Sequence, residues 1–398
     1  MDHRRGVITR GRSELTHSRH SGAPPISDLI DPRSATYLPK SAEADFDAVS
    51  PECRQAIPLA LRASFPPMEA LSVDVIPTGE AWQYEPKWDG FRCLVFRDGR
   101  AVELQSKSGQ SLTRYFPELI EDVLRLKAQK LVLDGEIAVP ADSTFSFDAL
   151  LQRIHPAHSR VNKLARGTPA LLIAFDLLLA DGKSLIAMPL RERRRELESF
   201  AAKYLRSAKR IRLSPATAKL SEAKAWLKRV GGTLDGIVAK RRDLPYRSGE
   251  RDGMQKIKNY RSADCVVGGF RYNEGKPVVG SLLLGLYDAK GLLNHVGFTS
   301  TIKRDEKPAL TRKLKTLIAP PGFTGNAPGG PSRWSTKRSG EWHPLKPELV
   351  VEVCYDHFAG DRFRHGTRLM RCRPDKSPRQ CTMDQVKQKK SKLIELLK

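Results

Sequence analysis

One lysine, Lys87, stands in a stretch whose residue types could support covalent chemistry. Residues 84–92 read YEPKWDGFR, so that an acid, an aromatic residue, a glycine and an arginine surround the lysine. A lysine amine is a nucleophile only when it is deprotonated, and its reference pKa is about 10.4. Lys87 would therefore have to be desolvated, or lie near other cations, to react at neutral pH. The stretch alone also fits an ordinary surface lysine at the start of a turn.

Acidic residues further along the chain could bind a sugar or a divalent metal. Asp134 and Glu136 belong to residues 131–139, an apolar segment that is typical of a strand. Carboxylates at a strand end can bind a ribose hydroxyl or a metal, although a solvated turn also explains them. Asp235 precedes a predicted strand at residues 236–240, where it can turn into a cleft as a hard oxygen ligand for Mg²⁺.

Basic residues suited to phosphate follow in two places. Lys256 and Lys258 alternate along a predicted strand, so both side chains lie on one face. Surface lysines with this spacing are common. Near the C-terminus, Arg371, Arg373 and Lys376 offer guanidinium and ammonium groups that suit phosphate oxygens.

The elements that must position these residues indicate an α+β domain with antiparallel sheets. Alternating polarity predicts a three-stranded meander at residues 82–84, 92–97 and 101–105, with Asp98-Gly99 as a hairpin turn. Further strands are predicted at residues 131–139, 171–179 and 236–240. Helical spacing of apolar residues predicts helices at residues 116–127, 147–154, 190–204 and 221–230.

The composition changes near residue 262, and the remaining chain predicts a small closed β-barrel. Strand-like segments at residues 264–272, 277–287 and 292–300 are separated by turn signals, which makes an OB-fold the candidate. A helix at 305–318 and strands at 349–355 and 367–371 would complete it. We predict four parts: a flexible basic arm (1–55), the α+β domain (56–262), the barrel (263–385) and a basic, helical C-terminal tail (386–398).

Charge and composition narrow the class of function. The chain has 69 Lys and Arg residues against 45 Asp and Glu residues, a formal net charge of +24. Such an excess points to a polyanionic partner, with nucleic acid favoured over a merely solvated basic surface. Six scattered cysteines without a C-x-x-C pair indicate neither a zinc site nor a disulfide framework. No apolar stretch approaches the roughly 20 residues that span a bilayer, so we expect a cytoplasmic protein without a membrane partner.

In their order along the chain, these pieces resemble the motifs of covalent nucleotidyltransferases, the superfamily of DNA ligases, RNA ligases and mRNA capping enzymes. Residues 87–92, KWDGFR, are similar to the K-x-D-G-x-R signature, and the resemblance covers about residues 65–385. Residues 84–96, 112–119 and 350–376 particularly resemble small bacterial ATP-dependent DNA ligases of the end-joining type. The resemblance implies an adenylation (nucleotidyltransferase) domain followed by an OB-fold domain.

The resemblance also implies a role for each matching residue. Lys87 would carry AMP, Glu85 would read the adenine and Phe175 would stack on it. Contacts to the sugar and the phosphates would come from Arg92, Glu136, Lys240, Lys256 and Lys258. Mg²⁺ or Mn²⁺ would be held by Asp235 and Glu136, and DNA would be contacted by Lys107 and Arg92. The mobile last motif, expected to orient the leaving pyrophosphate, would be Arg373, Asp375 and Lys376.

Two residues depart from the family pattern. Asp235 stands where most members carry Glu, and its shorter side chain would shift a bound metal or admit a water. Lys107 stands where the family usually has arginine. Lysine keeps the charge but loses the bidentate fork, which would weaken the grip on a 5′-phosphate.

The reaction that the resemblance implies is the sealing of nicks in duplex DNA by way of lysyl-AMP. ATP would charge Lys87, the AMP would move to the 5′-phosphate, and the 3′-hydroxyl would then displace it. The surrounding lysines would help to keep Lys87 deprotonated. DNA repair by end joining, a Ku-like partner, a monomeric state and a nucleoid location in a bacterium are further expectations. An RNA ligase, a GTP-dependent capping guanylyltransferase and a non-catalytic nucleic-acid-binding protein remain alternatives.

Overall fold

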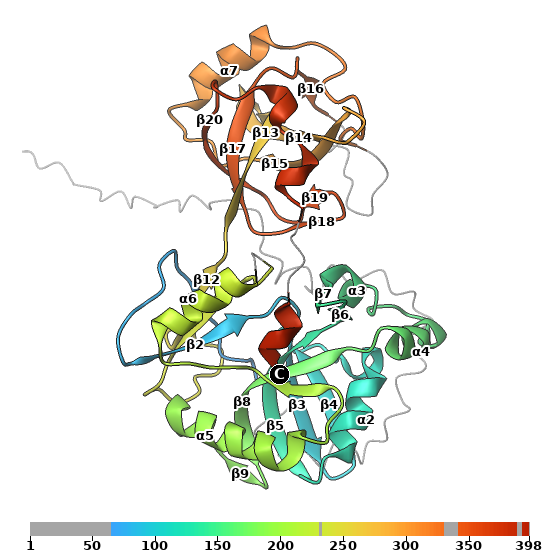
Figure 1. The fold of residues 1–398 in the computed structure, drawn as a ribbon, viewed down its shortest axis with the longest axis vertical. Helices are drawn as coiled ribbons and strands as arrows, with labels where there is room; N and C mark the ends of the chain where they lie inside the picture. Colours follow the sequence, from blue (N-terminus) through green and yellow to red (C-terminus); the bar gives the residue numbers. More distant parts are fainter. Residues whose placement is uncertain (1–64, 231–232, 330–340, 388–391, 398) are drawn as a thin grey trace, which may run out of the picture. The chain divides into compact units, whose positions relative to one another are not determined.

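The computed structural model describes residues 65–230, 233–329, 341–387 and 392–397 (Figure 1). The predicted arm, residues 1–55, and the predicted start of the α+β domain at residue 56 lie outside these ranges. Among the described residues, no helix is long and apolar enough to cross a membrane.

A four-stranded sheet bears Lys87 at the end of its edge strand. Its strand order is β1 (Leu71–Ser72), β12 (Met254–Lys258), β11 (Gly236–Arg241) and β2 (Trp82–Lys87). β11 pairs antiparallel with β12 and β2, whereas β1 pairs parallel with β12. Gly236 stands opposite both Lys87 and Lys258, so that three distant chain segments meet at one end of the sheet. A Cβ at Gly236 would collide with the Ile257 carbonyl oxygen, and therefore only glycine fits this crossing.

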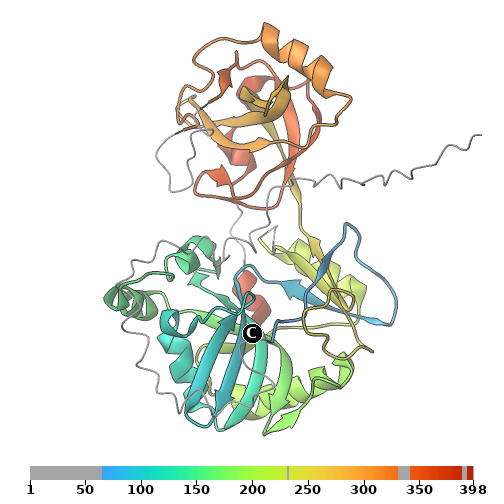
Figure 2. The ribbon, with the colours of Figure 1, turned by 180° about the vertical axis from the view of Figure 1, so that it is seen from behind.

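A second sheet forms the core of the N-terminal half, and Figure 2 shows its long strands side by side. The order is β10 (Ile211–Leu213), β8 (Leu171–Ala180), β5 (Lys130–Ala138), β3 (Phe91–Asp98) and β4 (Ala101–Ser106), with β9 (Lys183–Ser184) on β8. Apart from the parallel pair of β10 with β8, these strands are antiparallel. The α+β prediction is confirmed, with a parallel edge pair in each sheet that the sequence did not reveal.

The predicted meander is confirmed for its second and third strands, because β3 and β4 pair antiparallel across the turn that follows Asp98. Its first strand is wrongly placed, because β2 belongs to the first sheet and pairs with β11. The chain leaves the first sheet after Lys87 and enters the second at Phe91. Gly90 allows this passage: a Cβ there would collide with the Ile137 carbonyl oxygen of the neighbouring strand, β5. β5 then occupies the edge of β3 that a meander would have given to β2.

Helices cover the two sheets close to the predicted positions. α2 (Pro117–Arg125) begins with proline, carries Glu118 in its first turn and ends on arginine, which suits the helix dipole. The other predicted helices are α3 (Phe147–Leu151), α5 (Leu190–Phe200) and α6 (Leu220–Arg229), and α5 continues into a π turn, η5 (Ala201–Leu205). α4 (His158–Gly167) was not predicted, because its buried face is reduced to Val161 and Ala165. The short elements are η4 (Thr113–Tyr115), β6 (Pro140–Ala141) and β7 (Thr144–Phe145).

The C-terminal half is the five-stranded barrel that the sequence predicts. The order is β15 (Leu293–Thr299), β14 (Lys276–Tyr287), β13 (Arg261–Asn273), β17 (Val350–Tyr355) and β20 (Arg368–Cys372). A parallel bridge between Thr299 and Thr367 joins the two outer strands and closes the ring. Along the chain, α7 (Lys307–Thr316) lies between the barrel strands β15 and β17. This is the OB-fold arrangement. The short strands are β16 (His343–Pro344), β18 (Phe358–Ala359) and β19 (Arg362–Phe363).

The C-terminal tail is not the continuous helix that was predicted. After the short turns η7 (Pro378–Gln380) and η8 (Met383–Gln385), Val386 is buried in the barrel core. The last described element is a 3₁₀ turn, η9 (Leu393–Leu397), which belongs to a hydrophobic cluster of the N-terminal half together with Trp88. Leu393 and Leu396 are buried in this cluster, and their segment forms a short turn in place of the helix that their spacing predicts.

Candidate active site

The predicted nucleophile ends β2 and is paired with an acid. Lys87 keeps 21% of its side-chain area exposed, and its ammonium donates a hydrogen bond to the Asp235 carboxylate. Asp235 is buried and immediately precedes β11, whose first residue stands opposite Lys87. Behind this pair, the indole of Trp88 donates to the Ser214 hydroxyl at 2.9 Å, which fixes the backbone next to the lysine.

The pairing decides the protonation state of Lys87. Burial pulls the pKa of this lysine down, but the negative charges of Asp235, Asp89 and Glu136 outweigh burial and raise the pKa. The expectation that neighbouring cations keep Lys87 deprotonated is therefore wrong for this state. The reason is that the amine donates a hydrogen bond to Asp235, whose carboxylate stabilises the ammonium.

A pocket beside Lys87 gathers residues from segments that are far apart in the sequence. Met68, Trp88, Val238 and Met254 form part of its apolar lining. Eight residues that were predicted for nucleotide or DNA contact also line it: Glu85, Lys87, Arg92, Lys107, Glu136, Phe175, Lys240 and Lys256. The lining therefore combines apolar side chains with many convergent charged groups, which suits a charged small molecule.

Arg92 is held in this pocket by a buried carboxylate. Its Nε and Nη2 donate to the two oxygens of Asp134 at 2.5 and 2.6 Å, and Asp134 is fully buried. The guanidinium carbon lies 4.6 Å from the centre of the Phe175 ring, and the Lys240 ammonium lies 4.4 Å from the same centre. The ring of Phe175 is thus a π surface in contact with two cations.

Glu85 and Lys240 form a buried ion pair between neighbouring strands. The Lys240 ammonium lies 2.8 Å from Glu85 Oε2, and the Gln83 amide donates to Oε1 at 2.9 Å. The two charged side chains retain only 2% and 5% of their area. Much of the charge of Lys240 is therefore neutralised within the protein.

Glu136 is a half-buried carboxyl that lines the pocket among charged neighbours. It accepts a hydrogen bond from the Gly90 amide at 3.1 Å. Burial raises its pKa to about 8, although the positive charges of Arg92 and Lys87 oppose the rise. In its protonated form the group can donate as well as accept a hydrogen bond.

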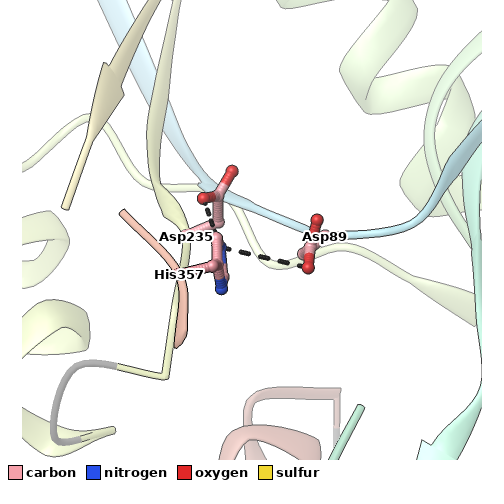
Figure 3. Close-up of side chains that lie close together, drawn as sticks. All are labelled: Asp89, Asp235 and His357. Atoms are coloured by element: carbon pink, nitrogen blue, oxygen red, sulfur yellow. Dashed lines mark hydrogen bonds and ion pairs between the residues drawn. The ribbon is translucent and has the colours of Figure 1, made fainter. Parts of the chain in front are cut away.

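Figure 3 shows a second acid and a histidine beside Asp235. His357 Nε2 lies 2.7 Å from Asp235 Oδ1 and 3.9 Å from an oxygen of Asp89, and one ligand atom from each of the three lies within 4.8 Å of the others. Burial would raise the pKa of Asp235, but Lys87 and His357 outweigh it and hold the pKa far below its usual range. Two hard oxygen donors and an imidazole nitrogen could hold a divalent cation.

The barrel reaches this cluster through the segment between β17 and β20. Asp356 pairs with Lys258 at 2.7 Å, and Arg364 Nη1 donates to Asp89 at 2.6 Å. Lys258 is therefore engaged by the barrel, whereas its strand neighbour Lys256 faces the pocket. Burial and the nearby lysines, Lys87 first among them, lower the pKa of Lys256.

The predicted last motif lies elsewhere on the barrel. Arg373 pairs with Asp264 at 2.9 Å and with Asp375 at 2.8 Å, and Lys376 lies 3.5 Å from Asp264. These partners all belong to the barrel, so this state does not bring the motif to Lys87. Lys107, in contrast, lines the pocket and pairs with Glu69 at 3.1 Å.

Family models match most of the described chain. Residues 67–258 match the model of the ATP dependent DNA ligase domain, and residues 275–376 match that of the ATP dependent DNA ligase C terminal region. The chain is also 44% identical over 336 residues to DNA ligase C2 of Mycolicibacterium smegmatis, which covers 80% of this chain and 93% of the relative. The chain belongs to the ATP-dependent DNA ligases.

Two further proteins are less similar to this ligase than DNA ligase C2 is. The multifunctional non-homologous end joining protein LigD of Mycobacterium bovis is 33% identical over 300 residues, which cover 75% of this ligase and 37% of LigD. A solved structure named Pmar-Lig_PreS3 is 18% identical with a TM-score of 0.51, and the match covers 73% of this ligase and 63% of that chain. At 18% identity, the similarity to Pmar-Lig_PreS3 supports the fold alone.

Several residues that shape the site of this ligase were not assigned a role from sequence. Asp89 lies inside the signature, so its position was visible. Asp134 was expected, like Glu136, to bind a sugar or a metal, but it is fully buried and holds Arg92 instead. His357 and Arg364 come from a part of the barrel that no local pattern connects to Lys87. Tyr246, which contacts Asp134, lies between two strands and carries no motif signal.

Proposed function

We propose that this ligase seals nicks in duplex DNA through a lysyl-AMP formed on Lys87. The observation that carries the proposal is the position of Lys87 at the edge of a pocket that combines an aromatic ring with several cations. The pocket has the components that an adenine nucleotide needs: the Phe175 ring for the base, and Arg92 and Lys256 for sugar and phosphate oxygens. We further propose that Glu85 recognises the adenine, with Lys240 holding its carboxylate in place.

In the first step the Lys87 amine attacks the α-phosphorus of ATP. A nitrogen–phosphorus bond forms, the bond to the bridging oxygen breaks, and pyrophosphate leaves. Because the ammonium pairs with Asp235, Lys87 must lose a proton before it can attack. Catalysis then depends chiefly on positioning and on charge neutralisation around the phosphates.

The Asp235 and Asp89 carboxylates fit a divalent cation such as Mg²⁺ or Mn²⁺, because both offer hard oxygen ligands within one cluster. Such an ion would supply positive charge there, and Asp235 would then neutralise the Lys87 ammonium less, which would favour the free amine. Glu136, the other predicted metal ligand, lies outside this cluster and accepts from the Gly90 amide instead. We assign it to a ribose hydroxyl.

In the later steps the AMP moves from Lys87 to the 5′-phosphate of the nick, and the 3′-hydroxyl displaces it to form the phosphodiester. We propose that Arg92 and Lys107 contact the 5′-phosphate. The last motif would serve the first step, which requires the barrel to turn so that Arg373 and Lys376 face the pocket. The proposed domains are residues 56–262 for adenylation and 263–385 for the barrel, with a hinge at 261–264.

The wider role follows from charge and from the relatives. The net charge of +24 supplies affinity for the DNA backbone without sequence specificity, and this affinity should fall steeply with salt. The name of the mycobacterial LigD supports a role in end joining. We also propose a Ku-like end-binding partner. We propose that the ligase acts as a monomer at the bacterial nucleoid.

The test uses α-labelled ATP and GTP with Mg²⁺, followed by denaturing electrophoresis to detect label on the protein. We expect label from ATP only, with none in Lys87→Ala and wild-type amounts in the exposed control Lys224→Ala. A nick-sealing assay with DNA and RNA strands then defines the substrate. Label from GTP would favour a capping enzyme, preference for RNA an RNA ligase, and absence of label in the wild type would overturn the proposal.

A further inference from the structure

A buried tyrosine supports the pocket from a segment without a recognised motif. Tyr246 lies between β11 and β12 and is only 4% exposed. Its hydroxyl donates to Asp134 Oδ2 at 2.7 Å and accepts from the Met68 amide at 2.9 Å. The hydroxyl therefore uses both its donor and an acceptor position within the protein.

The Asp134 oxygen that accepts from Tyr246 also accepts from Arg92. Arg92 Nη2 donates to Oδ2 of Asp134 at 2.6 Å and to the Met68 carbonyl at 3.3 Å. Tyr246, Met68, Arg92 and Asp134 thus form a closed ring of hydrogen bonds. Two of the four, Met68 and Arg92, line the nucleotide pocket.

Packing fixes the tyrosine ring itself. Phe65 stacks on it with a centroid distance of 5.9 Å and an interplanar angle of 16°. The Arg193 guanidinium lies 5.6 Å from the ring centre and pairs with Asp176, the neighbour of Phe175. A rigid ring gives its hydroxyl a fixed direction, which a solvent-exposed group would lack.

We propose that Tyr246 is a positioning residue for Arg92, acting through Asp134. Asp134 is a fully buried carboxylate, and its orientation decides where the Arg92 guanidinium points. Without the tyrosine hydroxyl, Asp134 Oδ2 keeps only Arg92 as a hydrogen-bond partner. Asp134 and Arg92 can then shift together away from the Met68 carbonyl. The inference depends on the proposed function, because the consequence is a displaced Arg92 during lysyl-AMP formation and nick sealing.

The test compares Tyr246→Phe with Arg92→Lys and with the double variant. We expect each single change to lower the rate of nick sealing about ten-fold, the loss that follows removal of one hydrogen bond to a charged group. The double variant should be within two-fold of Arg92→Lys, because both changes disturb the same contact. The matched control is Tyr84→Phe, a buried tyrosine whose hydroxyl donates to Pro77 at 2.8 Å; it should stay within two-fold of the wild type. Additive losses in the double variant would refute the positioning role.

Two analogues of equal shape separate the hydrogen bond from packing if Tyr246→Phe does not fold. 4-Aminophenylalanine at position 246 keeps a donor toward Asp134, whereas 4-methylphenylalanine fills the same space without one. We expect near wild-type sealing with the first and a ten-fold loss with the second. Equal activity of the two would overturn the inference. A wild-type enzyme that takes no label from ATP would instead contradict the proposed function.

Discussion

The buried ion pair of Glu85 and Lys240 gives the sharpest prediction for stability. Lys240→Met removes the cation and leaves the Glu85 carboxylate, 2% exposed, with a single hydrogen bond from Gln83. Removing one partner of a buried pair typically costs about 3–5 kcal/mol, since the remaining charge stays desolvated. The amide of Gln83 offsets only part of this cost. We therefore expect Lys240→Met to lower the free energy of unfolding by about 3 kcal/mol.

Urea unfolding followed by circular dichroism measures this loss. The double variant Glu85→Gln/Lys240→Met removes both charges and should recover at least half of it, because no isolated charge remains buried. Lys219→Met is the matched control: its pair with Glu222, at 3.2 Å, is exposed on both sides and should contribute nothing measurable. A Lys240→Met protein as stable as Lys219→Met would refute the reasoning, as would a double variant less stable than the single one.

Three further predictions concern protonation and the tail. Asp235→Asn should lower the pKa of Lys87 in the nucleotide-free enzyme, measured by the NMR shift of the dimethylated amine against pH; an unchanged pKa would mean that the ion pair does not hold the proton. Glu136 has a folded-state pKa raised to about 8, so the folded protein binds the extra proton and loses stability as pH rises from about 4.5 to 8. Glu136→Gln should therefore have a higher urea midpoint than the wild type at pH 9, and the difference should vanish at pH 4.5. A difference in urea midpoint that does not change with pH would contradict this prediction. Leu396→Asp should lower the melting temperature and shift tryptophan emission to longer wavelength, because it places a charge in the hydrophobic cluster that buries Trp88. The control Leu292→Asp, at an exposed site, should change neither quantity.

Much of the fold was accessible from local sequence patterns. The apolar run of β8 and the alternation in β3 predict strands because period and burial agree there. The barrel followed from evenly spaced strands with turn signals between them, and its closure by the Thr299–Thr367 bridge completes the expected ring. Apart from the closing bridge, each of these features depends on residues that are close in sequence or on the hydrophobic face of a single element.

The sequence-based predictions that are wrong concern contacts between distant segments of the chain. Nothing local in β2 shows that it pairs with β11, about 150 residues later, and not with β3. The burial of Leu393 beside Trp88 is likewise a long-range contact, so the local spacing of the tail's leucines predicts a basic helix instead.

The site shows the same division between local and distant information. The signature around Lys87 placed the candidate nucleophile, but its protonation depends on Asp235, an acid 148 residues away. His357 could not be foreseen either, because only the folded barrel brings it to Asp235. Residue types were thus more predictable than the charge states that their neighbours impose.

Formation of a covalent adenylate on Lys87 is the central claim, and mass spectrometry tests it most directly. The purified protein is incubated with ATP and Mg²⁺, its intact mass is measured, and peptides are mapped to locate the modification. We predict one added AMP, on the Lys87 side chain, that disappears when pyrophosphate is supplied in excess and is absent from Lys87→Ala. A folded, ATP-supplied protein without the adduct, or with AMP on another residue, would contradict the account.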